Sequence, residues 1–319
     1  MAIPCVLFHW LFSQANAILF HMNRRIDYPI SEADSGRTIE YFLRQQGYTH
    51  SILVLLKRTQ EGILLNGIWA RTSDRLYGGD LLTVSIEEPH QSSDILPSAV
   101  MPAIAYEDED IIILDKPAHM PIHPSLNHYE NTLANALMSY FSGKGEYFTF
   151  RCVNRLDRDT TGLTIVAKHI LSAVVLNRQI TERRIHRTYL AICEGCTEES
   201  GTITAPIARK EASTVERCVD FKNGESAITH YRRLAYRADL HLSLVQLQLE
   251  TGRTHQIRVH MSYIGHPLIG DFLYNANYTH ISRQALHSAS LEFEHPVTHQ
   301  KMHLTSDLPS DMKCLFPSY

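Results

Sequence analysis

The chain has 319 residues, of which 44% are hydrophobic and 20% are charged, and its formal net charge is −4 at pH 7. This composition is typical of a globular protein with ample apolar sequence for a core, and the length suits one large domain plus a small one. It excludes a chain that binds nucleic acid through an overall positive charge. Any such binding must therefore come from local basic patches.

Residues 1–21 are apolar but lack a basic start, and polar residues such as His9 and Asn16 interrupt them. They are too short and too interrupted for a transmembrane helix, so no membrane partner is expected. Ala15-Asn16-Ala17 leaves a signal-peptide cleavage site open as an alternative. We favour the hypothesis that the native protein begins at Met22 and is cytoplasmic.

The cysteines show no spacing of a disulfide framework, and Cys193 and Cys196 form a lone CxxC motif. A structural zinc site would need a second cysteine pair or histidines at ligand spacing, and neither follows. A redox pair is an alternative. Reduced thiols in the cytosol fit the pattern better.

Residues 22–88 have the pattern of a small domain. An amphipathic helix is predicted over Thr38–Gln46 and a second apolar helix over Ser51–Arg58. Asn66-Gly67 predicts a tight turn between two short strands, and Leu81–Ile86 alternates as a third strand. A generic small α+β domain would show the same order of elements.

This order resembles the alpha-L RNA-binding domain found in a small-subunit ribosomal protein and in many RNA-modifying enzymes. The resemblance rests on Arg37, the "LLNG" turn and "GGDLLTV". From Arg37 to Asp80 there are six basic and four acidic residues, an excess of two. Phosphate neutralisation by Lys and Arg governs RNA affinity, so we expect modest binding by this degenerate domain alone.

Residues 89–102, rich in proline and serine, read as a linker, and residues 103–319 as a second, larger domain. Strands and helices follow one another there without a regular βαβ rhythm, which predicts an α+β fold with a largely antiparallel or mixed central sheet. The expected strands are Asp110–Asp115, Leu163–Ala167, Ile185–Glu194, Ser226–Tyr236 and His241–Glu250, and the expected helices are Asn131–Phe141 and Ser172–Arg184.

The stretch Cys152–Lys168 places Arg155, Asp157 and Asp159 within five positions, just before a Thr-Thr-Gly turn and a strand. Such a turn can hold a carboxylate on rigid backbone, as a nucleophile or base requires. Taken alone, the stretch reads more readily as a solvated surface loop. From residue 151 to 190, however, eight Lys or Arg stand against three Asp or Glu, an excess of five that predicts a local positive field.

A second dense stretch, Thr251–Asp271, reads TGRTHQIRVHMSYIGHPLIGD. If Thr254–Tyr263 is helical, Thr254 can cap it, and Arg258 lies one turn further on the same face. Arginine pairs bidentately with carboxylates and phosphates. His255, His260 and His266 are offset by five and six residues and share no helical face, so a metal site is not expected.

Paired-carboxylate glycosidase chemistry is also disfavoured. It needs converging carboxylates, and the side chains of Asp157 and Asp159, two positions apart, are expected to diverge. The remaining interpretation is one carboxylate positioned by an arginine. Arg258 is preferred as that partner, with Arg253 as the alternative.

Asn154–Gly162, reading NRLDRDTTG, resembles the HRLDxxTSG motif of RluA-type pseudouridine synthases. Arg187-Thr188-Tyr189 resembles the basic-x-Tyr strand of that family, and Thr251–Asp271 its TGRTHQIRVH…GHPxxGD block. Leu286-His287 with His295-Pro296 resembles its C-terminal ending. Asn154 stands where the family has His and Thr161 where it has Ser, which leaves the nucleophile in place.

The resemblance implies isomerisation of uridine to pseudouridine in RNA, without a metal or an organic cofactor. Asp157 would be the catalytic carboxylate, as nucleophile or as base, and Arg258 would pair with it. Tyr189 would stack on the uracil and could take part in the final proton removal, although a core position is an alternative for it. The target uridine would first be flipped out of the folded RNA.

The remaining expected substrate contacts are polar side chains of the two motifs and of the basic strand. They are Arg155, Arg158, Thr160, Arg187, Arg253, His255, Gln256 and His260. By family analogy the substrate is large-subunit ribosomal RNA, with transfer RNA second, and the enzyme is expected to be a monomer. A non-catalytic RNA-binding or ribosome-assembly factor and a glycosidase acting on nucleosides are the rival functions.

Overall fold

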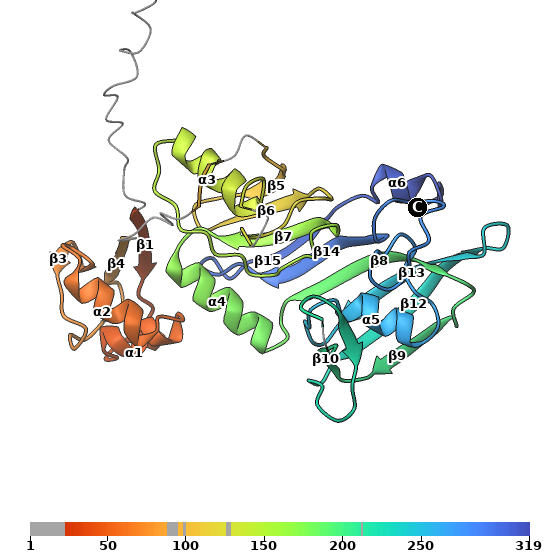
Figure 1. Ribbon diagram of the computed structural model, residues 1–319. Helices are drawn as coiled ribbons and strands as arrows, with labels where there is room; N and C mark the ends of the chain where they lie inside the picture. The colour runs from red at the N-terminus through yellow and green to blue at the C-terminus, as the bar shows by residue number, and fades with distance from the viewer. Residues whose placement is uncertain (1–22, 88–94, 98–99, 126–128, 212) are drawn as a thin grey trace, which may run out of the picture.

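The computed structural model describes residues 23–87, 95–97, 100–125, 129–211 and 213–319. The predicted leader and most of the predicted linker lie outside these ranges. A small unit at the N-terminus lies beside a larger α+β unit (Figure 1). In the described part of the chain, no helix is both long enough and apolar enough to cross a membrane.

The small unit is an antiparallel sheet with two short α-helices. The sheet has the order β1-β4-β2-β3, and Asn66 and Gly67 take the positive φ of a tight turn between β2 and β3. The helices begin after Thr38 and Thr49, whose side chains accept backbone N–H bonds as N-caps. The elements are β1 (Asn23–Pro29), η1 (Glu32–Asp34), α1 (Ile39–Gln45), α2 (His50–Arg58), β2 (Ile63–Leu65), β3 (Ile68–Trp69) and β4 (Leu81–Glu87).

The large unit is built on a mixed sheet, which confirms the predicted fold class. Its order is β5-β6-β7-β14-β8-β13-β12-β9, with β15 paired to β14, and among the described strands only β7 and β14 run parallel. The strands are β5 (Ala103–Glu107), β6 (Ile111–Lys116), β7 (Thr161–Ala167), β8 (His186–Glu194), β9 (Ser200–Thr204), β12 (Ile228–Arg237), β13 (Leu242–Leu249), β14 (Leu286–Glu294) and β15 (Lys301–Thr305).

Helices cover both faces of this sheet. On β6, Ile112 and Leu114 pack against α3 (Leu133–Gly143), while Ile111 and Ile113 belong to the cluster under α4 (Ile170–Thr181). This alternation explains why the strand is apolar on both sides. Helix α5 (Gln256–Tyr263) packs on β8 and β13, and α6 (Ser310–Lys313) covers the opposite face of the same strands.

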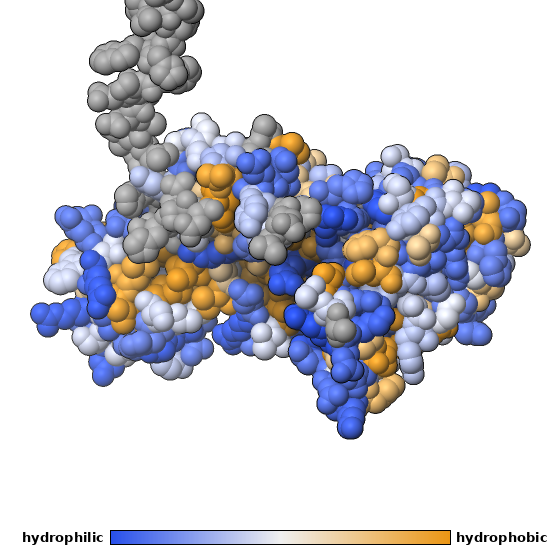
Figure 2. All heavy atoms as spheres, in the orientation of Figure 1, coloured by the Kyte–Doolittle hydropathy of each residue, from blue (hydrophilic) through white to orange (hydrophobic). Residues whose placement is uncertain are grey.

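A two-stranded hairpin, β10 (Ile207–Arg209) and β11 (Arg217–Val219), projects from the large unit near α5. Figure 2 shows mainly hydrophilic side chains over this projection. The hairpin was not predicted, because each of its strands has only three residues and its sequence shows no sustained alternation.

Several predicted helix ends are shifted by one to three residues, and two of the shifts have a clear local cause. Helix α5 begins at Gln256, and its N-cap is His255 in a left-handed conformation, with φ 58°, rather than Thr254. The Gln256 side chain itself accepts hydrogen bonds from the Arg253 N–H and the Thr251 hydroxyl, so a threonine cap is not needed. Helix α4 ends at Thr181 rather than Arg184, because Arg183 turns left-handed with φ 57°.

Gly162 stands where the 152–160 segment enters the sheet. Its φ is +103°, and a Cβ atom there would lie 2.3 Å from the carbonyl oxygen of Ser288 on β14. Only glycine allows both this φ and this close approach of two strands without strain. Gly162 therefore fixes the parallel contact between β7 and β14.

We predict that Gly162→Ala lowers the free energy of unfolding by more than about 2 kcal/mol, because the new methyl group must push β7 and β14 apart. Urea denaturation would measure the effect. Gly143→Ala is a matched control, since its Cβ would meet nothing within 4 Å and its φ is not positive. Equal stabilities of the two variants would contradict this account.

Candidate active site

The loop that carries Asp157 is fastened to the strand it precedes. The Asn154 side chain accepts a hydrogen bond from the Ile165 N–H at 2.7 Å and donates one to the Leu163 carbonyl at 3.3 Å. The Thr160 N–H closes a turn on the Asp157 carbonyl at 3.1 Å. The carboxylate is thus held at the entrance to β7, and Asn154, which departs from the family motif, braces the loop.

Asp157 is paired with Arg258 of α5, as predicted. Arg258 Nη1 donates to Asp157 Oδ2 at 2.9 Å, and the side chains are 1% and 27% exposed, respectively. The alternative partner, Arg253, points elsewhere, because it pairs with Glu225 and donates to the Ser226 carbonyl. Asp157 is therefore the more open end of a buried ion pair and faces the solvent side.

Asp271 holds the other side of the Arg258 guanidinium. Nε and Nη2 of Arg258 donate to its two oxygens at 2.6 and 2.7 Å, and Asp271 is fully buried. Because these two hydrogen bonds use Nε and Nη2, Nη1 of Arg258 remains free to bind Asp157. Burial alone would lower the pKa of Arg258, but its hydrogen bond to Asp271 and the charge of Asp157 raise that pKa above the ordinary value. No role for Asp271 was predicted from the sequence.

Aromatic and imidazole rings surround the pair. The Arg258 guanidinium lies 5.4 Å from the centre of the Phe272 ring and 5.1 Å from that of Tyr274. His255 Nε2 lies 3.9 Å from Asp157 Oδ2, and its Nδ1 lies 3.1 Å from the Tyr274 hydroxyl. Burial lowers the pKa of His255. The site is thus buried on the Arg258 side and partly exposed at Asp157.

A cavity of about 740 Å³ opens over Asp157. This volume lies within the range of pockets for small ligands. Tyr189 of β8 lines it, and the same side chain belongs to an apolar cluster with Leu156 and Ile257. Burial raises the pKa of the Tyr189 hydroxyl. Tyr189 therefore occupies both predicted places, as a member of the core and as a wall of the cavity.

The cavity brings together most of the expected substrate contacts. Arg158 is not among its lining residues and instead forms an ion pair at 2.8 Å with the buried Asp159. His260 is fully buried, and its ring nitrogens lie 2.8 Å from the Thr229 hydroxyl and the Ala205 carbonyl, so its predicted place in the site is corrected to a structural one. The expected substrate contacts that do line the cavity are Arg155, Thr160, Arg187, Arg253, His255 and Gln256.

The predicted basic field is weaker than the charge count indicated. Arg178 and Arg184 both pair with Glu182, and Arg183 pairs with Glu250 at 2.6 Å. In contrast, Nε of Arg187 is buried and has no hydrogen-bond partner among the described residues. Arg187 is thus better placed than the arginines at the end of α4 to meet a ligand in the cavity.

Lys116 is a second residue that sequence reasoning missed. Its fully buried Nζ donates to the carbonyls of Pro117, Met120 and Arg158 at 2.8–2.9 Å. Burial lowers the pKa of Lys116 to about 7, against the charges of Asp159 and Asp157. The bond to the Arg158 carbonyl fixes the backbone next to Asp157. The sequence feature that could have predicted this role is a lysine at the end of an apolar strand.

The three histidines that were weighed as metal ligands each have their own hydrogen-bond partners. His266 Nδ1 lies 2.9 Å from the Glu194 carbonyl, while His255 and His260 have the separate partners described above. In the CxxC motif Cys193 is buried and Cys196 is exposed, and both are free thiols.

The sequence pattern of the family described as RNA pseudouridylate synthase matches residues 110–263. An uncharacterized RNA pseudouridine synthase of Bacillus subtilis, YjbO, is 38% identical over 279 residues, covering 87% of this chain and 98% of that protein. The chain belongs to the RluA-type family of RNA pseudouridine synthases. It is therefore an isomerase whose substrate is RNA.

Two further similar proteins also carry the name of pseudouridine or pseudouridylate synthases. Ribosomal large subunit pseudouridine synthase D of Pseudomonas aeruginosa is 36% identical over 292 residues, covering 86% of this chain and 90% of that protein. The solved structure of human RNA Pseudouridylate Synthase Domain Containing 1 is 28% identical and superimposes with a TM-score of 0.55, over 66% of this chain and 85% of that one.

We predict that Asp271→Asn lowers kcat by about a hundredfold with little change in KM. The amide cannot hold the Arg258 fork, so the guanidinium and with it Asp157 shift, and a misplacement of about 1 Å costs a factor of this order. Steady-state release of tritium from carbon 5 of uracil in RNA would measure both constants.

Asp239→Asn is the matched control, because it breaks an arginine–carboxylate pair with Arg237 that is exposed. It should leave kcat unchanged. A KM effect without a kcat effect in Asp271→Asn would contradict the positioning role.

Proposed function

We propose that this enzyme converts uridine to pseudouridine in structured RNA, that Asp157 is its catalytic carboxylate, and that its substrate is large-subunit ribosomal RNA. The observation that carries the proposal is the arrangement Asp157–Arg258–Asp271, a carboxylate fixed by a buried, doubly paired arginine at the wall of a cavity large enough for a nucleoside. The choice of ribosomal RNA is supported by several relatives that are named ribosomal large subunit pseudouridine synthase D.

The reaction is an internal exchange at one nucleotide. The bond between ribose C1′ and uracil N1 breaks, a bond between C1′ and C5 forms, and the proton of C5 moves to N1 by way of the solvent or a side chain. A carboxylate near the glycosidic bond can serve as the nucleophile at C1′ or C6, or as a base toward the ribose. Asp157 is open enough for these roles and is oriented for them by Arg258.

The detached uracil must rotate without leaving the enzyme. Tyr189 offers a ring in the cavity wall on which the base can stack, and its raised pKa keeps its hydroxyl protonated at neutral pH. A uridine in a folded RNA reaches such a cavity only after it is flipped out of its stack. Arg187 and Arg155, which both line the cavity, would hold the extruded nucleotide or its phosphates.

The N-terminal unit is proposed as a second RNA contact. It exposes Tyr41, Trp69 and Tyr77 together with Arg37 and Arg71, and the Arg37 guanidinium lies 5.2 Å from the centre of the Tyr41 ring. Exposed aromatic rings and arginines are typical of proteins that stack on bases and pair with phosphates. The small charge excess predicts that this contact adds to binding but does not dominate it.

We predict that Asp157→Asn abolishes tritium release from total RNA labelled at carbon 5 of uracil, taken from a strain that lacks the enzyme. The amide keeps the shape of the side chain and still meets Arg258, but it is neither a nucleophile nor a base at neutral pH. RNA affinity, measured by filter binding, should stay within about twofold, since the variant changes one charge that faces the flipped base.

Absence of release by the wild-type enzyme would favour the non-catalytic RNA-binding factor. Release by Asp157→Asn at the wild-type rate would refute the role of this carboxylate. Release of free uracil without pseudouridine in the product would instead indicate a nucleoside glycosidase.

A further inference from the structure

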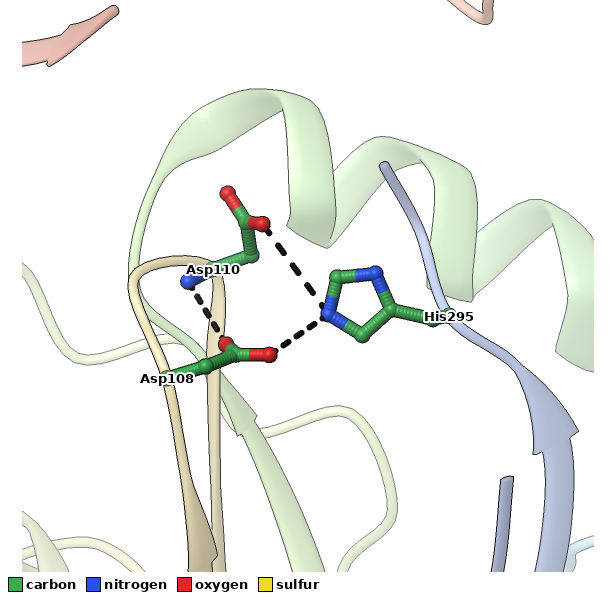
Figure 3. A group of neighbouring side chains, drawn as sticks. All are labelled: Asp108, Asp110 and His295. Atoms are coloured by element: carbon green, nitrogen blue, oxygen red, sulfur yellow. Dashed lines mark hydrogen bonds and ion pairs between the residues drawn. The ribbon is translucent and has the colours of Figure 1, made fainter. Parts of the chain in front are cut away.

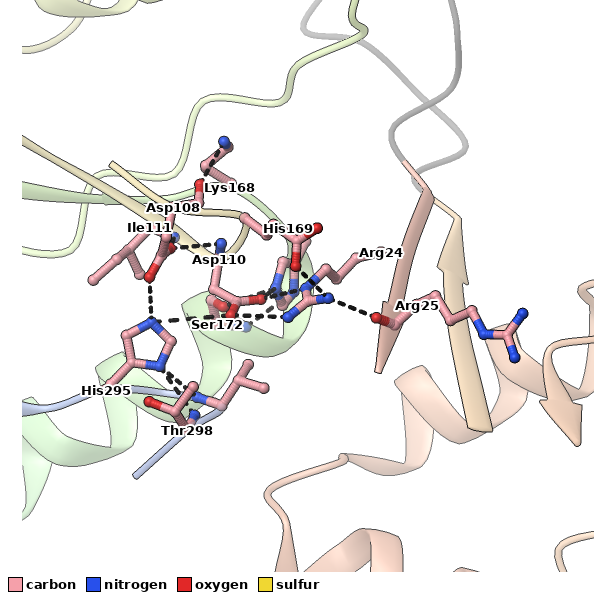
Figure 4. Close-up of polar contacts among 12 residues, drawn as sticks. Arg24, Arg25, Asp108, Asp110, Ile111, Lys168, His169, Ser172, His295 and Thr298 are labelled. Carbon is pink, nitrogen blue, oxygen red and sulfur yellow. Dashed lines mark hydrogen bonds and ion pairs between the residues drawn. The ribbon is translucent and has the colours of Figure 1, made fainter. Parts of the chain in front are cut away.

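The N-terminal unit is joined to the catalytic unit by a buried ion pair. Arg24 of β1 donates through Nε to Asp110 Oδ1 at 2.6 Å and through Nη2 to Oδ2 at 3.2 Å (Figure 4). The two side chains are 17% and 3% exposed, although they are 86 residues apart in the sequence. Arg24 Nη1 also pairs with Glu109 at 2.8 Å. An ion pair this well covered is expensive to open.

Asp110 is held in position to accept hydrogen bonds from this arginine. His169, at the start of α4, lies 2.8 Å from Asp110 Oδ1. Burial raises the pKa of Asp110, but the hydrogen bonds and charges of His169 and Arg24 together lower that pKa below its ordinary value. The neighbouring Asp108 accepts a hydrogen bond at 2.8 Å from His295, which follows β14. Four segments of the chain therefore meet at the contact, from β1, the β5–β6 turn, α4 and the end of β14.

The ligand atoms of Asp108, Asp110 and His295 lie within 4.8 Å of one another, a spacing that could hold a metal ion (Figure 3). The oxygens are already used, however. Asp108 also accepts the N–H groups of Asp110 and Ile111 and the Tyr106 hydroxyl, and Asp110 accepts both arms of Arg24. The guanidinium therefore supplies the positive charge that a metal ion would otherwise supply.

An apolar contact reinforces the ion pair. Leu171 and Val175 of α4 belong to the core cluster of the N-terminal unit, with α1, α2 and β4. Gly47 approaches Val175 so closely that a Cβ atom would lie 2.7 Å from Val175 Cγ2. At the margin, His299 Nε2 lies 3.3 Å from the Gln46 side-chain oxygen. The two units thus share one piece of core, which is unusual for domains that move independently.

Strand β7 connects this contact to the active site. Its first residue, Thr161, follows the Asp157 loop, and its last, Ala167, precedes Lys168 and His169. Six steps of about 3.3 Å give a distance of roughly 20 Å between the two ends. Because β7 is buried along its whole length, it can act as a spacer of fixed length.

We propose that the contact formed by Arg24, Asp110 and the α4 face, here called the joint, docks the N-terminal unit at a fixed distance from Asp157, so that uridine selection in structured RNA depends on simultaneous contact with both units. This inference rests on the proposed function. Two binding sites held at a matching distance raise the effective concentration of the second contact, and a loosened linkage reduces it. The joint therefore acts on RNA binding and leaves the chemistry at Asp157 alone.

The docking half is tested by small-angle X-ray scattering on the full chain without RNA. Arg24→Gln removes the ion pair, and Val175→Glu places a charge in the apolar contact from the other unit. Both should increase the maximum dimension of the particle. Arg25→Gln is the matched control, since Arg25 is adjacent on the same strand and exposed, and its loss removes the same charge. A compact particle for both joint variants would overturn the proposal.

The selection half is tested by tritium release from total ribosomal RNA labelled at carbon 5 of uracil. Arg24→Gln and Val175→Glu should raise KM roughly tenfold with an unchanged kcat, whereas Arg25→Gln should match the wild type. If a variant shows the increased maximum dimension but keeps the wild-type KM, the selection claim is overturned. If the wild-type enzyme releases no tritium, the proposed function fails, while the scattering result still decides whether the joint docks the unit.

Discussion

The site depends on one buried cation, the guanidinium of Arg258. A charge that is 1% exposed is tolerated only when it is paired and fully hydrogen-bonded, and here two carboxylates divide the task. Asp271 binds the fork and is buried with it, while Asp157 takes the remaining nitrogen and stays open to the cavity. Removal of one partner from such a pair costs about 3–5 kcal/mol. The convergence of three distant segments follows from that requirement.

Strand β7 of the sheet positions the Asp157 loop at one end and leads to the contact with the N-terminal unit at the other. Gly162 allows β7 to lie against β14, which sets where the Asp157 loop leaves the sheet. Lys116 holds the other side of the same loop through the Arg158 carbonyl. At its far end β7 leads into the joint where Arg24 meets Asp110. A single buried strand thus connects Asp157, the proposed catalytic carboxylate, to the proposed RNA-binding unit.

Local patterns in the sequence were sufficient for several of the elements and for the pairing of Asp157 with Arg258. The apolar run before Lys116, the Asn-Gly turn and the alternation in β13 each predicted the observed element, and the two motifs brought Asp157 and Arg258 together. Helix ends failed where a side chain replaced the expected cap, as Gln256 does at α5. A hydrogen bond between a side chain and a nearby backbone group is too short-range to appear in any periodicity.

The partners of charged groups could not be predicted in the same way. Asp271 binds Arg258, 13 residues away in the sequence, and Arg24 binds Asp110, 86 residues away. In both cases the fold brings the partners together, and several other carboxylates in the sequence could equally have paired with these arginines. The same holds for the arginines at the end of α4, whose charge count indicated an RNA-binding field but which are paired with Glu182 and Glu250. Net charge over a segment does not reveal which charges remain open.

The central claim is that Asp157 isomerises a uridine of large-subunit ribosomal RNA. It is tested most directly by mapping pseudouridines in the total RNA of two strains, the parent and one whose chromosomal copy carries Asp157→Asn. The account predicts that one or a few pseudouridines of large-subunit ribosomal RNA are lost in the variant and that all others persist. Identical maps for the two strains, or losses confined to transfer RNA, would contradict it.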